Sequence, residues 1–109
     1  MQLSDAIMAG SKLRPQAFGA YFKDSKSCAF GAALEAIGIG YCESLRTIDL
    51  GMRFDGDILC LSVCCPKCDL SDRLTYTIFH LNDFHRAGRN FIAFWVREIE
   101  DRMEAGGGG

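Results

Sequence analysis

Four residues in the second half of the chain have the types and the spacing that bind a metal ion. Cys65 and Cys68 are separated by two residues, His80 and His85 by four, and eleven residues lie between the pairs. Two thiolates and two neutral imidazoles satisfy the tetrahedral preference of zinc, and this spacing is close to that of two-cysteine, two-histidine fingers. The sequence therefore predicts a Zn²⁺ site with Cys65, Cys68, His80 and His85 as ligands.

Other assignments of the cysteines stay open. In the run from Asp57 to Cys65, strand-like alternation places Cys60 and Cys64 on one face and Cys65 on the other. We therefore expect Cys60 and Cys64 to be small buried apolar residues. One alternative is a set of three cysteines and one histidine that uses Cys64. Another is that the cysteines pack as thiols in the core and the histidines are polar groups on a helix face.

A turn and a helix would have to position the ligands. Pro66 fixes its own φ angle and narrows the turn between the two cysteines. The run after Cys68 predicts a helix capped by Ser71 or Asp72. Its apolar stripe would be Leu74, Ile78, Leu81 and His85. His80 and His85 would lie roughly 140° apart on a regular helix, so we expect a loosened helix end.

The remaining elements are predicted from caps and breakers. A first helix opens at Leu3 with Ser4 as its cap and ends at Gly10, and a second follows Ser27 and ends at Gly38. Between them we expect a short strand over 20–22 and a solvated loop over 23–27. Residues 44–51 predict a short helix. Around Asp55-Gly56, a hairpin would pair 52–54 with 58–63 and deliver the cysteine turn.

A long helix is predicted after Gly88, over residues 89–105. Its apolar stripe is Phe91, Ile92, Trp95, Val96, Ile99 and Met103. Phe94 lies beside this stripe, and one helix face cannot bury so many large apolar residues in a thin domain. We therefore expect Phe94 and Trp95 to contact a protein partner or a second copy of the chain.

Length and composition limit the possible classes of protein. With 109 residues and 49% hydrophobic content, the chain predicts one folded α+β domain over residues 1–105, with about four helices. A zinc-finger-like unit would span 58–85, and 106–109 would be a flexible glycine tail. No apolar run could cross a membrane, and the N-terminal residues lack signal-peptide features. We expect a cytoplasmic protein, in which cysteines serve as thiols or metal ligands.

Cys28 is a second candidate for chemistry. It lies in the predicted first turn of the second helix, where the helix N-terminus lowers a thiol pKa and could make a nucleophile. A thiol enzyme also needs a base, and both histidines are better used as zinc ligands. We therefore expect Cys28 to be a packed structural thiol, with catalysis by Cys28 as the alternative.

Two segments of the sequence resemble a known group of proteins. The runs SCAFGAALEAIG and HLNDFHRAGRNFIAFWV, together with CPKC, resemble small bacterial and phage proteins of uncharacterised function with a CAxGAA helix, a CPxC knuckle and an HLND motif followed by a histidine. The resemblance spans Leu3 to about Val96 and implies no reaction. Ala87-Gly88 departs from it, because an aromatic residue and a Ser or Thr cap are expected there.

The leading hypothesis is a zinc-stabilised domain that binds another macromolecule, most plausibly a protein. Four protein ligands would close the coordination sphere, as in structural sites. The net charge of −2 argues against a DNA-binding protein. A local basic face could still bind nucleic acid, and its members would be Arg73, Arg86, Arg89, Arg97 and Arg102. The enzymatic alternatives are the Cys28 thiol or a zinc hydrolase with one ligand replaced by water.

Overall fold

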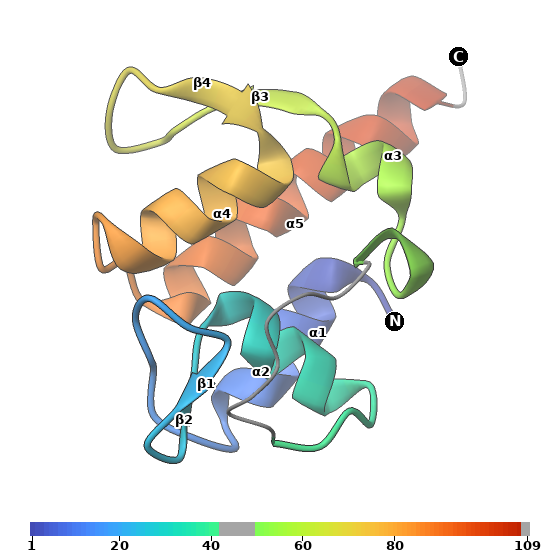
Figure 1. Ribbon diagram of the computed structural model, residues 1–109. Coiled ribbons are helices and arrows are strands. Elements are labelled where there is room, and N and C mark those ends of the chain that lie inside the picture. Colours follow the sequence, from blue (N-terminus) through green and yellow to red (C-terminus); the bar gives the residue numbers. More distant parts are fainter. Residues whose placement is uncertain (42–49, 108–109) are drawn as a thin grey trace.

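Helices and two small hairpins alternate along the chain in the computed structural model, which describes residues 1–41 and 50–107 (Figure 1). The elements of this part are α1 (Leu3–Ser11), β1 (Phe22–Lys23), β2 (Lys26–Ser27), α2 (Ala29–Ala36), the 3₁₀ turn η1 (Leu50–Met52), α3 (Gly56–Leu59), β3 (Ser62–Cys64), β4 (Ser71–Arg73), α4 (Leu74–Asp83) and α5 (Arg89–Gly107). The α+β class is confirmed, with five α-helices among these residues. Most of the helix predicted over 44–51 lies outside the described residues.

The first helix crosses the second at very short range. Gly10 lies inside α1, so the prediction that it ends this helix is wrong. A Cβ atom at Gly10 would lie 1.7 Å from the carbonyl oxygen of Ala32 in α2. Glycine is therefore required here by the close approach of two backbones.

A distant side chain caps α1. The cap position is Gln2, whose side chain makes no capping bond, and the predicted cap Ser4 lies inside the helix. The backbone N–H and the hydroxyl of Ser4 both donate to the carboxylate of Glu100, which is buried in α5. Glu100 thus places a negative group at the N-terminus of α1 and fixes α5 against it.

The polar run after Phe22 forms a hairpin rather than the predicted loop. Strands β1 and β2 pair antiparallel, with Lys23 opposite Lys26. The two residues between them have positive φ angles, 52° at Asp24 and 61° at Ser25. Two such residues in succession form the tight turn that suits the twist of a hairpin.

The predicted pairing of 52–54 with 58–63 is wrong. Asp55 caps α3 instead, since its carboxylate accepts a hydrogen bond from the N–H of Asp57 (3.0 Å). An Asp before Gly serves as well at a helix N-terminus as in a hairpin turn, and here the helix forms. The strand partner of β3 is β4, with Ser62 opposite Arg73 and Cys64 opposite Ser71. This hairpin encloses the cysteine turn.

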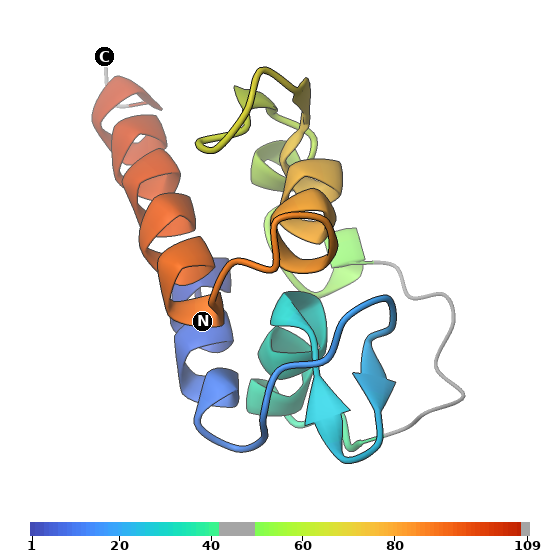
Figure 2. The ribbon, with the colours of Figure 1, turned by 90° about the vertical axis from the view of Figure 1, so that its left-hand side faces the viewer.

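The long helix α5 supports the rest of the molecule. It runs beside α1 and then past it toward the β3–β4 hairpin (Figure 2). Fully buried residues of α4 and α5 form much of the core, namely Leu74, Ile78, Leu81, Ile92 and Val96. The helix continues to Gly107, so two of the four residues predicted as a tail belong to it, while 108–109 lie outside the described residues.

Candidate metal centre

The four predicted ligands converge at one point. One ligand atom from each of Cys65, Cys68, His80 and His85 lies within 4.8 Å of all the others. These residues could therefore hold a metal ion. They come from the turn between β3 and β4 and from the C-terminal end of α4, which lie side by side in Figures 1 and 2.

The β3–β4 turn positions the two cysteines. The N–H of Cys65 donates to the carbonyl oxygen of Leu70 (2.8 Å), which closes the turn at its base. The N–H of Lys67 donates to the Cys65 sulfur (3.4 Å), a bond inside the turn that links the two cysteines. Cys65 is buried, whereas Cys68 is exposed and its Sγ lies 3.3 Å from Nε2 of His80.

The end of α4 positions the two histidines as expected, although its start differs from the prediction. Ser71 and Asp72 belong to β4, and the helix cap is Arg73 without a side-chain bond. His80 lies in the last turn, and His85 lies beyond the helix end. The N–H of His85 donates to the carbonyl oxygen of His80 (3.2 Å), and the two rings meet edge to face with centroids 4.7 Å apart. The expected loosened helix end is confirmed.

His85 supplies a direct test of whether a metal fits. Its Nε2 atom is buried and has no hydrogen-bond partner. The pKa of His85 is lowered by burial, and further by the positive charges of His80 and Lys67. His85 thus brings a neutral imidazole with a buried, unpartnered nitrogen to a group that also holds two sulfurs and a second imidazole. This is the donor set that a borderline-soft metal ion requires.

The aromatic side chains of α4 surround His80. Its ring stacks between Tyr76 and Phe84, with centroids 6.5 Å and 5.0 Å away and interplanar angles of 16° and 10°. Spacings of four residues place these three rings on one face of the helix. Phe84 is 73% exposed and Tyr76 is 52% exposed, so the column is open to solvent at both ends. The stack restricts the orientation of the His80 ring.

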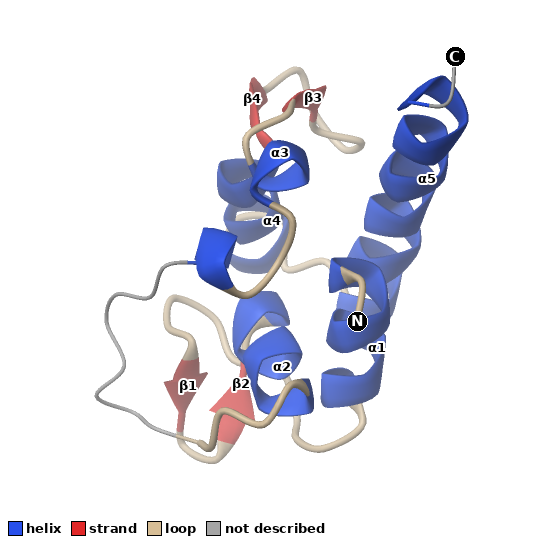
Figure 3. Ribbon diagram, turned by 90° about the vertical axis from the view of Figure 1, so that its right-hand side faces the viewer, coloured by secondary structure: helices blue, strands red, loops and turns tan. Residues whose placement is uncertain are grey.

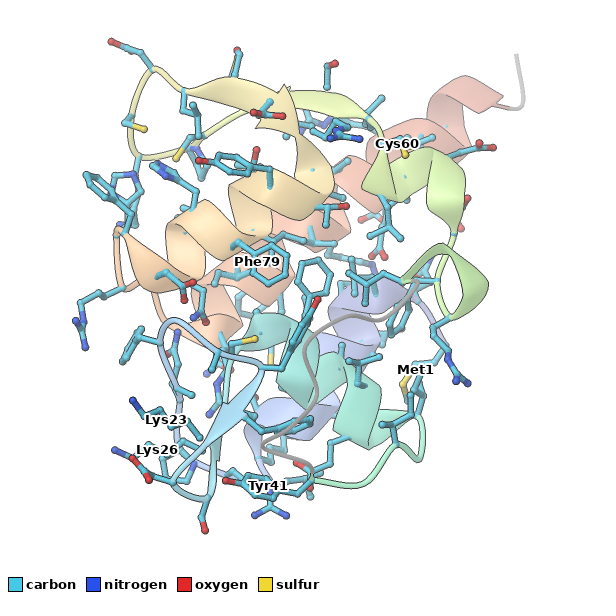
Figure 4. All side chains as sticks on the ribbon, in the orientation of Figure 1. Met1, Lys23, Lys26, Tyr41, Cys60 and Phe79 are labelled. Atoms are coloured by element: carbon cyan, nitrogen blue, oxygen red, sulfur yellow. The ribbon has the colours of Figure 1, made fainter. Side chains whose placement is uncertain are left out.

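The prediction that Cys60 and Cys64 are buried is wrong, since both are exposed. The alternation argument fails because residues 56–59 form α3, so that only residues 62–64 are extended. Figure 4 shows Cys60 directly after α3, away from the cysteine turn. The Cys64 sulfur lies 3.1 Å from the Ser71 hydroxyl, and Cys64 is not part of the group of four ligands.

Cys28 is a structural thiol in this fold. It is 2% exposed and is itself the cap of α2, where its sulfur accepts a hydrogen bond from the N–H of Gly31 (3.3 Å). Burial raises the pKa of the thiol to about 11, despite the hydrogen bonds at the helix N-terminus that lower it. A protonated thiol is a poor nucleophile, which supports the structural interpretation.

Two buried polar residues, at the end of α4 and at the start of α5, bond several segments of the chain, roles that the sequence analysis did not predict. Asn82, 1% exposed, bonds the backbone of Ala17 and Ala29, and the side chain of Gln16. Arg89, 8% exposed, donates to the carbonyl oxygens of Ser27, Ser11 and Arg14. The sequence feature that could have indicated a buried Asn82 is its position directly after Leu81, the last apolar residue of the α4 stripe.

One of the five arginines predicted to form a basic face is buried. Arg89 is buried and bonds carbonyl oxygens, so it does not contribute to a surface charge. Arg97 pairs with Asp5 and Asp101 across α5 and α1, and Arg86 stacks over the ring of Phe18 at 4.0 Å.

Comparison of the chain with protein-family models, curated proteins and solved structures gives no match. Among the described helices, none combines the length and apolar composition needed to span a bilayer.

Proposed function

We propose that this chain is a small zinc-stabilised domain that acts as a module for binding another protein. The observation that carries the metal assignment is the convergence of four donor atoms within 4.8 Å, in a group whose His85 has a buried imidazole nitrogen without a partner. Two sulfur and two nitrogen donors are typical of zinc among the biological metals.

The metal would have a structural role. Four protein ligands leave no open position for a substrate or an activated water molecule. Bound zinc supplies binding free energy that adds to the folding free energy. Cys65 and Cys68 would then be held to His80 and His85, which fixes the β3–β4 hairpin to the end of α4.

The outer surface of α5 supports the interaction role. Phe94 is 66% exposed and Phe91 is 41% exposed, while the neighbouring Trp95 is partly buried. Large aromatic side chains on a surface are typical of protein interfaces. We propose that this surface of α5, with Phe94 and Trp95, binds a protein partner or a second copy of the chain.

Metal analysis of protein purified without added zinc tests the first part. We expect one zinc per chain by elemental analysis, and loss of that zinc in Cys65→Ser and His85→Ala. Cys64→Ser is the matched control, since it changes the adjacent cysteine and should retain the metal. Folded wild-type protein that holds no zinc, or loss of zinc in Cys64→Ser, would contradict the assignment.

A further inference from the structure

Strand β3 has only one paired edge. In the antiparallel ladder with β4, hydrogen-bonded pairs alternate with non-bonded pairs. The N–H of Leu74 donates to the carbonyl oxygen of Leu61, and the N–H of Cys65 donates to that of Leu70. By this alternation, Val63 also bonds β4, whereas the main-chain groups of Ser62 and Cys64 point to the opposite edge. The described residues place no strand along that edge.

A groove follows this free edge. It has a volume of about 440 Å³, and its lining residues are Leu61, Ser62, Val63, Cys64, Trp95, Ile99, Arg102 and Met103. Figure 3 shows β4, β3 and α5 in that order across the molecule, so the free edge of β3 faces α5. The groove therefore has unpaired main-chain donors and acceptors along one wall and an apolar helix surface along the other.

We propose that this groove binds an extended segment of a protein partner, which adds to β3 as a third strand. The N–H and C=O groups of Ser62 and Cys64 would exchange hydrogen bonds with the main chain of the segment. Its side chains would contact the partly buried Trp95 and Met103, so they should be apolar at alternate positions. This inference rests on the proposed role in protein binding and assigns that role a surface and a class of partner.

The charge in the groove specifies the segment further. Arg102 is the one charged residue in the lining, and its described hydrogen bond runs to a backbone carbonyl oxygen, that of Glu98. No carboxylate among the described residues pairs with it. An acidic residue in the bound segment would complement this guanidinium.

The geometry favours a short extended segment over the other occupants. A helix satisfies its own main-chain groups, so it would leave the edge of β3 unpaired. A second copy could not pair its own β3 here in the same way, because each free edge faces the α5 of its own chain. Three residues of β3 extend over roughly 10 Å, which suits a segment of a few residues.

The test uses the zinc-loaded full chain and a phage-displayed library of random heptapeptides. Trp95 is the only tryptophan in the sequence and it lines the groove, so its fluorescence reports binding of the selected peptides. We expect selected peptides to alternate apolar and polar residues and to include Asp or Glu. Ser62→Pro removes an outward N–H without breaking the ladder to β4, and should weaken binding by at least ~10-fold, or about 1.4 kcal/mol. Ser62→Ala keeps the N–H and should bind normally.

A second comparison changes the peptide and keeps the protein wild type. N-methylation of alternate nitrogens in a selected peptide should abolish binding in one register and spare it in the other, because only every second N–H of an edge strand faces its neighbour. Equal binding to Ser62→Pro and Ser62→Ala, indifference to N-methylation, or no selected peptide that changes Trp95 fluorescence would overturn the proposal. Zinc content is measured in the same samples. Absence of peptide binding by protein that holds zinc would contradict the groove proposal alone, whereas absence of zinc would contradict the metal assignment.

Discussion

The side-chain oxygen of Asn82 accepts a hydrogen bond from the backbone N–H of Ala29, the first residue of α2, at 3.1 Å. The amide group of the same side chain donates to the carbonyl oxygen of Ala17 at 2.9 Å. Asn82 thus caps one helix from the end of another and bonds buried main-chain groups of two segments, the start of α2 and the loop at Ala17. Because Asn82 lies between His80 and His85 in the sequence, these bonds fix the part of the chain that carries the two histidines to the core.

Replacing Asn82 should destabilise the whole domain. Asn82→Ala leaves the N–H of Ala29 and the carbonyl oxygen of Ala17 buried without partners, and we expect a loss of roughly 3 kcal/mol in the free energy of unfolding. Urea denaturation measures this change. Asn82→Asp retains an acceptor for Ala29 but turns a second, charged acceptor toward the carbonyl oxygen of Ala17 and the carboxylate of Asp83, so it should cost at least as much as Asn82→Ala. Equal stability of wild type and Asn82→Ala would show that these bonds contribute nothing.

The crossing of α1 and α2 should tolerate no side chain at Gly10. Gly10→Ala places a methyl group against the backbone of Ala32, and we expect a loss of roughly 1–3 kcal/mol or more as the helices separate. Gly56→Ala in α3 is the control, because nothing lies within 4 Å of its added Cβ. That control should be neutral or slightly stabilising, by up to about 1 kcal/mol from helix propensity. Thermal unfolding of both variants in parallel gives the comparison.

The buried thiol of Cys28 predicts a pH dependence. Its pKa in the folded chain is about 11, against an ordinary value of 9.0. The unfolded chain therefore loses this proton first, so the stability contributed by the neutral thiol is complete below pH 9 and falls as the pH rises toward 11. Burial raises the pKa of Tyr21, and the nearby Cys28 thiolate raises it further. Burial lowers the pKa of Arg89, and the Cys28 thiolate opposes part of that change.

Two measurements check the behaviour of Cys28. The fall in Tm above pH 9 should be smaller in Cys28→Ala than in wild type. The difference between the two proteins isolates the effect of Cys28, because all other titrating groups are the same in both. At neutral pH, iodoacetamide should label exposed Cys60 quickly and Cys28 slowly, as read by peptide mass spectrometry. Labelling of Cys28 as fast as Cys60 would contradict the structural role and favour a reactive thiol.

The convergence of Cys65, Cys68, His80 and His85 could be predicted from the sequence because their residue types and spacing are typical of a metal site. The histidine helix and the last helix could also be predicted, since their apolar stripes persist over several turns. The β3–β4 pairing could not, because strands of three residues carry little periodicity. Whether Asp55-Gly56 makes a hairpin turn or a helix cap is decided by the packing of the buried residues Ile58 and Leu59.

The caps show a second limit of sequence analysis. Ser4 and Ser27 have the side chains that local rules assign to helix caps, yet tertiary partners replace both of them. Glu100 caps α1 from 96 residues away, and the hydroxyl of Ser27 instead accepts a hydrogen bond from Arg89. Local propensity cannot anticipate partners so distant in the sequence. The buried roles of Asn82 and Arg89 were missed for the same reason.

Removal of the metal should loosen the cysteine turn more than the core. The residues of α4 that face the core remain buried by α5 and held by Asn82, whereas the β3–β4 turn has few other contacts. With a strong chelator, we expect a lower Tm and faster amide hydrogen exchange over 62–73, with smaller changes in α1 and α2. An unchanged Tm after verified removal of zinc would contradict a structural role for the metal.

The exposed surface of α5 predicts self-association. Phe94 is 66% exposed in the isolated chain, and its burial in a two-fold symmetric contact would remove a large aromatic surface from water. Sedimentation at micromolar concentration should show a dimer, and Phe94→Glu should dissociate it without loss of zinc. Glu98→Gln, on the same exposed side of α5 but without an aromatic ring, is the control and should remain dimeric. A wild-type monomer would leave Phe94 available for a different protein, and equal sedimentation of wild type and Phe94→Glu as dimers would place the interface elsewhere.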